Sequence, residues 1–243
     1  NQGPYHHLDI LKHSLETVRQ LEELFKTIRR NPKIRDYLDE MVSGERRRKA
    51  LMILAAFLHD VGKPAALRRR KGRIIFHGHE RIGADIAEAV ARRLKLSVDE
   101  IKSLQKMVMW HLRPGYLGDQ AEVSERAKFR YFRDAGEEAV STLLLSVADQ
   151  RSTRGRLTTE ESRQQHEKIV FGLIKDYYRQ KKEKKQKRLI NGDDLIRRLG
   201  LTPSALFGRI LSEVEELQAI GKIRSKVQAL KTARVLAREA PVR

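Results

Sequence analysis

The sequence contains no cysteine, which excludes a disulfide framework and any zinc site built on thiolates. Aromatic residues make up only 6% of the chain, so prominent base-stacking platforms for RNA are not expected. No apolar run approaches the roughly 18 residues of a membrane span, and no signal-peptide pattern opens the chain. We therefore expect a cytoplasmic protein with no membrane partner. Because the chain starts at Asn1 rather than Met, we expect it to be a processed, trimmed or partial product.

Basic residues outnumber acidic residues in this sequence. The sequence holds 51 lysines and arginines against 32 aspartates and glutamates, a formal net charge of +19. A surplus of this size favours a polyanionic partner, with nucleic acid first and an anionic membrane surface second. The alternative is a highly soluble surface without such a partner. Hydrophobic residues at 40% and charged residues at 34% are typical of a globular fold.

Hydrophobic residues recur with a helical period along nearly the whole chain, so the predicted fold class is all-α. Only residues 73–78 suggest a strand. The charge run "RQKKEKKQKR", residues 179–188, is interpreted as a basic linker or a helix extension. It divides a helical bundle, residues 1–178, from a small tail domain, residues 189–243, in which we expect three short helices.

Two aspartates, Asp60 and Asp149, end segments whose apolar residues mark them as buried helices. An ionised carboxylate there would cost several kcal/mol without a partner. His13, His59 and His111 lie on or at the ends of similar helices, so side chains from several helices of one bundle could converge on a metal ion. Imidazole and carboxylate ligands without thiolate suit Mn²⁺, Ni²⁺, Fe²⁺, Co²⁺, Mg²⁺ or Zn²⁺ alike. Such an ion activates water, and the associated reaction is hydrolysis of a phosphate ester.

The alternative for any one of these histidines is a hydrogen-bonded core residue, which is the commoner role of a single histidine on an apolar helix. The joint pattern of several histidines and two buried carboxylates without an evident partner favours the metal site. Of the other histidines, His77 stays undecided, and His166 is expected to be solvated because it lies among polar residues.

The sequence "HDVGK" (residues 59–63), with a histidine upstream and an aspartate downstream in "SVADQR", resembles the HD-domain superfamily of metal-dependent phosphohydrolases. The resemblance implies an HD-domain helical bundle that binds one or two divalent ions. It implies that one ion is bound by His13, His59, Asp60 and Asp149. It also places His79 and His111 where a second metal ion or the substrate binds. Asp60 and Lys63 would then be catalytic, and Lys63, with Arg113, would neutralise the substrate phosphate.

Three longer segments resemble the C-terminal half of bacterial tRNA nucleotidyltransferases (CCA-adding) and poly(A)-polymerase-like proteins. They are "YHHLDILKHSLETV", "FHGHERIGADIAEAV" and "LINGDDLIRRLGLTPSALFGRILSEVEE". In these families a nucleotidyltransferase head precedes the HD domain and the tail. The paired carboxylates of that head have no counterpart here, because Asp193 and Asp194 are interpreted as helix-capping residues. This chain alone is therefore not expected to add nucleotides.

Two hypotheses follow from the sequence. The first is an enzyme, a metal-dependent phosphohydrolase acting on phosphoesters of nucleotides or RNA ends. The second is a binding module: the tRNA-binding body of a nucleotidyltransferase whose catalytic head is missing or on another chain. In this second case basic side chains would contact RNA phosphates, namely Arg68, Arg69, Arg70, Lys181, Lys182, Lys184 and Lys185. The alternative for each basic segment is a solvated face without a partner.

Overall fold

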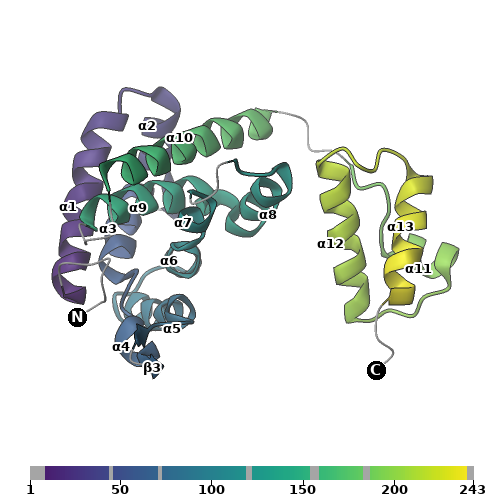
Figure 1. Ribbon diagram of the computed structural model, residues 1–243, viewed down its shortest axis with the longest axis horizontal. Coiled ribbons are helices and arrows are strands. Elements are labelled where there is room, and N and C mark those ends of the chain that lie inside the picture. Colours follow the sequence, from purple (N-terminus) through teal and green to yellow (C-terminus); the bar gives the residue numbers. More distant parts are fainter. Residues whose placement is uncertain are drawn as a thin grey trace. The chain divides into compact units, whose positions relative to one another are not determined.

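The computed structural model is almost entirely helical, which confirms the all-α prediction (Figure 1). It describes residues 9–43, 46–70, 73–118, 122–153, 159–182 and 187–239. Within these ranges the only sheets are two short antiparallel hairpins. No helix in the described part of the chain is both long enough and apolar enough to cross a membrane.

Internal contacts divide the chain into two units. Residues 1–122 and 135–177 form the first unit, and residues 123–134 and 178–243 form the second. The segment 123–134, which the sequence-based division included in the bundle, thus groups with the tail. The predicted domain boundaries otherwise stay a prediction, since part of the proposed linker (residues 183–186) lies outside the described residues.

The first unit consists of a helical bundle and two hairpins. Its helices are α1 (Ile10–Ile28), α2 (Pro32–Asp39), α3 (Arg48–Leu58), α4 (Lys63–Ala66), α5 (His79–Arg93), α6 (Val98–Trp110), α7 (Arg113–Gly118), the 3₁₀ turn η1 (Gly136–Glu138), α9 (Ala139–Ser152) and most of α10 (Glu160–Lys182). Its hairpins pair β1 (Met41–Ser43) with β2 (Arg46–Arg47) and β3 (Arg68–Arg70) with β4 (Arg73–Ile75). Of the four strands, the sequence predicted only β4.

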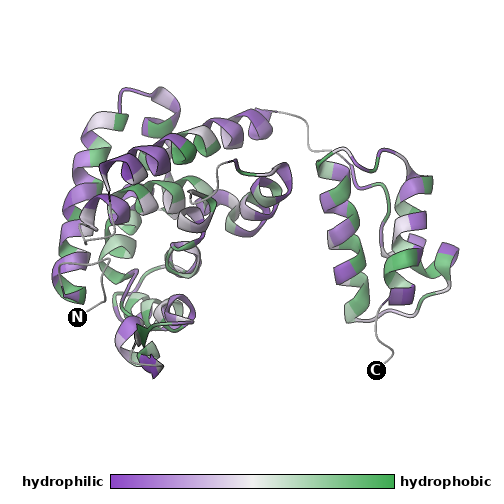
Figure 2. Ribbon diagram, in the orientation of Figure 1, coloured by the Kyte–Doolittle hydropathy of each residue, from purple (hydrophilic) through white to green (hydrophobic). Residues whose placement is uncertain are grey.

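Helix α9 lies at the centre of the bundle. Every residue from Ala139 to Ala148 is buried, and hydrophobic colour predominates along this helix in Figure 2. It packs against α1, α3, α6 and α7. Because α9 is enclosed from Ala139 to Ala148, polar groups in this stretch need partners among the surrounding helices.

Local sequence explains where other helices begin. Ser97 precedes α6 and accepts a hydrogen bond from the Glu100 backbone, while the Glu100 carboxylate accepts one from the Ser97 backbone. This reciprocal capping box satisfies amide groups that the first helical turn leaves unpaired. Asn191 and Asp194 form the same arrangement at the start of α11 (Gly192–Leu199), which is the capping role predicted for Asp194.

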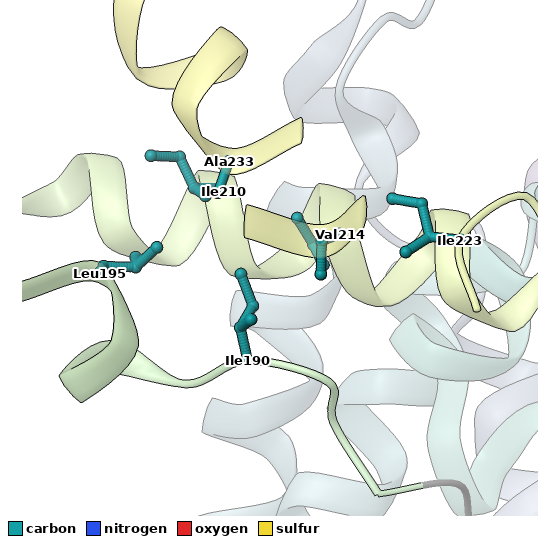
Figure 3. Close-up of a cluster of buried hydrophobic side chains, with 7 residues drawn as sticks. Ile190, Leu195, Ile210, Val214, Ile223 and Ala233 are labelled. Atoms are coloured by element: carbon teal, nitrogen blue, oxygen red, sulfur yellow. The ribbon is translucent and has the colours of Figure 1, made fainter. Parts of the chain in front are cut away.

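The second unit has its own small core. It contains α8 (Glu125–Ala135), α11, α12 (Ala205–Ala219) and α13 (Lys226–Glu239). The tail therefore has the three predicted helices. Buried side chains from α11, α12, α13 and the segments beside them gather in one cluster (Figure 3), which includes Ile190, Leu195, Ile210, Val214, Ile223 and Ala233.

Candidate metal centre

Six side chains selected from the sequence lie together in the first unit. Helix α1 carries His13, α9 carries Asp149, and His79 is the first residue of α5. The other three follow the C-terminal ends of helices: His59 and Asp60 follow α3, and His111 follows α6. Five of the six residues are at most 6% exposed. The exception is Asp149, whose side chain is 28% exposed. The cluster is therefore accessible to solvent at Asp149.

Asp60 lies at the middle of the cluster. Its Oδ2 is 3.5 Å from Nε2 of His13 and 3.3 Å from Nε2 of His59. Its Oδ1 is 3.3 Å from Nε2 of His79 and 3.7 Å from Nε2 of His111. The two oxygens of one carboxylate therefore face two different pairs of imidazoles.

Potential ligand atoms form two groups, each spanning no more than 4.8 Å. Group one is defined as His13, His59 and Asp149, and group two as Asp60, His79 and His111. Nε2 of His13 is 3.0 Å and Nε2 of His59 is 3.7 Å from Oδ1 of Asp149. This arrangement offers two adjacent ligand sets that share the Asp60 carboxylate.

Hydrogen bonds fix the tautomers of three of the rings. Nδ1 of His59, His79 and His111 lies 2.8, 2.8 and 2.6 Å from a backbone carbonyl oxygen three residues earlier in the chain. A carbonyl oxygen can only accept, so Nδ1 must carry the proton. Nε2 of the neutral ring is then a bare lone pair directed toward the carboxylates.

These three Nε2 atoms are buried and have no hydrogen-bond partner among the described residues. Buried polar atoms without partners are rare in proteins and call for an explanation. A divalent cation between the imidazoles and the carboxylates would supply it, because each Nε2 lone pair and each carboxylate oxygen would then face a positive charge. The imidazole–carboxylate set therefore fits a bound divalent metal ion.

Neighbouring charges and burial shift the pKa values of several side chains in the cluster. Burial, the largest single influence on Asp60, disfavours its ionised form, but His59, His79 and Lys63 together outweigh burial and hold the pKa of Asp60 well below its ordinary value. Burial likewise opposes the charge on His59, yet Asp60 and then Asp149 raise the pKa of His59 to about 9. At His111 burial prevails and, with the charge of His59, lowers the pKa to about 4. Without a bound ion the positive charge would therefore rest on His59, and His111 would be neutral at neutral pH. A bound divalent cation would take the place of the proton on Nε2 of His59.

Two cationic side chains adjoin the cluster. Lys63 is only 7% exposed, and its Nζ lies 2.6 Å from Oδ2 of Asp60 and 5.8 Å from the centre of the Phe76 ring. Arg113 begins α7, two residues beyond His111, and its guanidinium stacks 4.9 Å from the centre of the Trp110 ring. Lys63 is thus held inside the cluster. Arg113 lies close to the cluster in sequence, two residues after His111.

The remaining predicted phosphate-binding residues are not part of the cluster. Arg68 and Arg69 are exposed on β3, and Arg70 ends that strand. Lys181 and Lys182 are exposed at the end of α10. Lys184 and Lys185 lie outside the described residues.

One prediction was wrong, and one contact was missed. His166 is not solvated: it is 4% exposed, and its Nε2 lies 3.1 Å from Oγ of Ser146 in the enclosed helix α9. The missed contact is from Oγ of Ser152 to Nδ1 of His13, at 3.1 Å. Ser152 follows Asp149 by one helical turn, but no local pattern signals a contact between residues 139 positions apart. His77, left undecided, is exposed.

Comparison with known proteins covers almost the entire chain. A model of the HD domain family matches residues 10–154. The chain is 27% identical to an A-adding tRNA nucleotidyltransferase of Deinococcus radiodurans over 246 residues, which cover 99% of this chain and 49% of that protein. It is 27% identical to a CC-adding tRNA nucleotidyltransferase of Thermus thermophilus over 232 residues, or 94% of this chain and 45% of that protein. The chain therefore spans about half the length of these curated relatives.

Proposed function

Since this chain belongs to the HD domain family, we propose that it is a metal-dependent phosphohydrolase acting on phosphoesters of nucleotides or RNA ends. The proposal rests on the buried Nε2 atoms of His59, His79 and His111, which lie around Asp60 and have no hydrogen-bond partner among the described residues. In each of these rings Nδ1 already donates a hydrogen bond to a backbone carbonyl. A purely structural cluster of histidines would pair its ring nitrogens with acceptors and donors, as most buried polar groups do.

The six clustered residues would act as metal ligands in this proposal. Group one and group two would each hold one divalent ion, and Asp60 would serve both because its two oxygens face different groups. When bound, such an ion polarises a phosphoryl oxygen and lowers the pKa of an attached water. The partly exposed side of Asp149 would be the route by which a phosphoester approaches.

Lys63 and Arg113 would act on the substrate. Lys63 is already held at the carboxylate by a charge-assisted bond of 2.6 Å, so its ammonium can offset phosphate charge without first being ordered. Arg113 is planar and fixed against Trp110, which suits a bidentate contact to a phosphate. Both residues would stabilise charge that builds up on the phosphate, and no covalent enzyme intermediate is required.

The test compares wild type with Asp60→Ala. Metal content of the purified protein is measured by elemental analysis, and hydrolysis is measured with a generic phosphodiester, a 2′,3′-cyclic nucleotide and a phosphorylated oligonucleotide. We expect one or two equivalents of a divalent metal in wild type and loss of both metal and hydrolysis in Asp60→Ala. The matched control is Asp36→Ala, which removes a carboxylate that is 68% exposed on α2. A wild type that stays metal-free after reloading with Mn²⁺, Ni²⁺ or Mg²⁺ would defeat the proposal.

A second candidate function is RNA binding. In this case the chain would be the tRNA-binding body of a nucleotidyltransferase whose catalytic head is missing from this sequence or lies on a separate chain. The matches to two tRNA nucleotidyltransferases, which extend over nearly the whole chain, favour it. So does charge: α13 exposes Lys231, Arg234 and Arg238, and no carboxylate of the described residues pairs with them. Unpaired cations along one helix suit a phosphate backbone.

Salt dependence of tRNA affinity tests this candidate. Each phosphate contact adds about −0.9 to the slope of log K against log salt on a duplex, and removing one cation reduces the slope by about one unit. We expect a smaller slope when Arg68 and Arg69 are both changed to alanine, and likewise for Lys231→Ala. The control is Arg92→Ala, because Arg92 is exposed but already bonded to Glu88 at 2.6 Å. Weak tRNA binding at moderate salt with unchanged slopes would exclude this function.

A further inference from the structure

The four imidazoles of the cluster are oriented in two different ways. At His59, His79 and His111, Nδ1 contacts a backbone carbonyl three residues earlier, so no side-chain substitution can remove the acceptor. His13 differs, because its Nδ1 contacts the side chain of Ser152, on another helix, at 3.1 Å. The orientation of this one ring therefore depends on the identity of a residue outside the ligand set.

The hydrogen of the Ser152 hydroxyl is already committed. Oγ of Ser152 donates to the backbone oxygen of Asp149 at 2.7 Å, and a hydroxyl has one hydrogen to give. Toward His13 the serine oxygen must therefore accept, which puts the proton on Nδ1 of His13. Oγ1 of Thr17 lies 2.9 Å both from Oγ of Ser152 and from the His13 backbone oxygen, and since Ser152 has given its hydrogen to Asp149, Thr17 is the donor in its contact with Ser152. The arrangement is enclosed, because Ser152 is 1% exposed and Thr17 is fully buried.

We propose that Ser152 is a positioning residue for the first metal ion: its hydroxyl holds His13 as the Nδ1–H tautomer, so that Nε2 offers a lone pair to the ion in group one. This inference rests on the proposed metal centre. Without the hydroxyl, the buried Nδ1–H loses the Ser152 oxygen as its acceptor. The ring then gains by carrying its proton on Nε2 instead, where Oδ1 of Asp149 accepts it at 3.0 Å. A ring protonated at Nε2 cannot bind a metal ion there.

The effect should be confined to one of the two ligand groups. Group two uses His79 and His111, whose Nδ1 acceptors are backbone oxygens, and Ser152 contacts neither ring. Loss of the hydroxyl should therefore weaken one ion and spare the other. Removal of an outer partner of a ligating histidine typically lowers metal affinity by about 10- to 100-fold, and we expect a loss of that size at group one.

The same helix supplies a matched control. Oγ of Ser146 donates to the backbone oxygen of Leu143 at 2.8 Å and lies 3.1 Å from Nε2 of His166. Ser146 thus has the same two kinds of contact as Ser152, with similar distances and burial, but its histidine is not a member of either ligand group. Ser146→Ala reproduces the structural loss of a buried hydroxyl without touching the metal centre.

The experiment titrates Co²⁺ into metal-free wild type, Ser152→Ala and Ser146→Ala by calorimetry, with the visible Co²⁺ absorption recorded in parallel. We expect one of the two wild-type binding events to weaken by about 10- to 100-fold in Ser152→Ala, with a changed spectrum for that ion only, and both events to persist in Ser146→Ala. Equal affinities in the two variants, or equal weakening of both events in Ser152→Ala, would overturn the role of Ser152 while leaving the metal centre intact. A wild type that binds no Co²⁺ would overturn both.

Discussion

Gly62, in the "HDVGK" segment, lies against the backbone that presents His79. Its own conformation is ordinary, with φ −78° and ψ −14°, so a side chain is excluded by space alone. A Cβ at this position would lie 2.1 Å from the His79 backbone oxygen and 2.6 Å from the Gly83 backbone nitrogen. Gly62→Ala therefore tests whether the close approach of this turn to α5 positions the second ligand group.

The size of the effect follows from these distances. Real Cβ atoms essentially never lie closer than 3.0 Å to another heavy atom, so the His79 backbone must move by about 1 Å. Overpacking of this kind typically destabilises a protein by about 1–3 kcal/mol. The same displacement would break the 3.3 Å approach of His79 to Asp60. Misplacement of a catalytic group by about 1 Å can lower a reaction rate by about 10²-fold.

Metal content, phosphoester hydrolysis and thermal unfolding of the metal-free protein are the measurements. We expect Gly62→Ala to lose the group-two ion and most of its hydrolysis. The control is Gly172→Ala, at an exposed position inside α10 where a Cβ meets nothing within 4 Å. This change should raise stability by about 0.5–1 kcal/mol and leave the metal content unchanged. A Gly62→Ala protein with wild-type metal content and turnover would refute the argument that this contact positions His79.

Two further predictions concern buried carboxylates away from the metal centre. Glu138→Ala should destabilise the first unit by about 1–3 kcal/mol, because it removes the buried acceptor of Arg48, Ser103 and Ser141 and leaves Arg48 with the exposed Glu40 as its carboxylate partner. Metal uptake of the folded protein should persist, and a denaturation midpoint close to that of wild type would contradict the prediction. The second concerns acid stability. Burial, the largest influence on Glu216, raises its pKa, but hydrogen bonds from Arg130 and Arg126 outweigh burial and lower it below 4.5. The folded pKa lies below the unfolded one, so this stabilisation is present above about pH 4.5 and is lost as the pH falls through the folded value. Glu216→Gln should therefore reduce the acid sensitivity of the second unit in thermal scans between pH 3 and 6, and an unchanged profile would contradict it.

Several features of the fold and the site were predictable because their signals are local. The capping box at Asn191 depends on a side chain three residues away, and it lies where Asp193 and Asp194 were interpreted as helix-capping residues. Asp60, Asp149 and His111 were identified because a histidine or aspartate that ends a long apolar run is out of place in a core, whereas His79 was assigned only by the resemblance to the HD-domain superfamily. Such mismatches between a residue and its surroundings are visible without knowing which other helices pack nearby.

Other features depend on contacts between distant positions, which periodicity does not reveal. Arg48 and Glu138 lie 90 residues apart, yet they form a buried ion pair that Ser103 and Ser141 complete. His166 was assigned to the surface because its neighbours in sequence are polar, but one face of α10 packs inward and buries it. The short strands β1 to β3 were missed because two or three residues are too few for an alternating pattern to appear.

The position of ligands at helix ends has a physical cause. The last four carbonyl groups of a helix have no intrahelical donor, and a histidine just beyond the helix can donate its Nδ1–H to one of them. Ala56 and Val108 supply such carbonyls at the ends of α3 and α6, so His59 and His111 are oriented by their own helices. His13 lies near the start of α1 instead, where its own helix offers no such carbonyl, and it is oriented by a hydroxyl from another helix. The helix-end histidines are thus specified by local sequence alone, whereas the orientation of His13 requires α1 and α9 to pack correctly first.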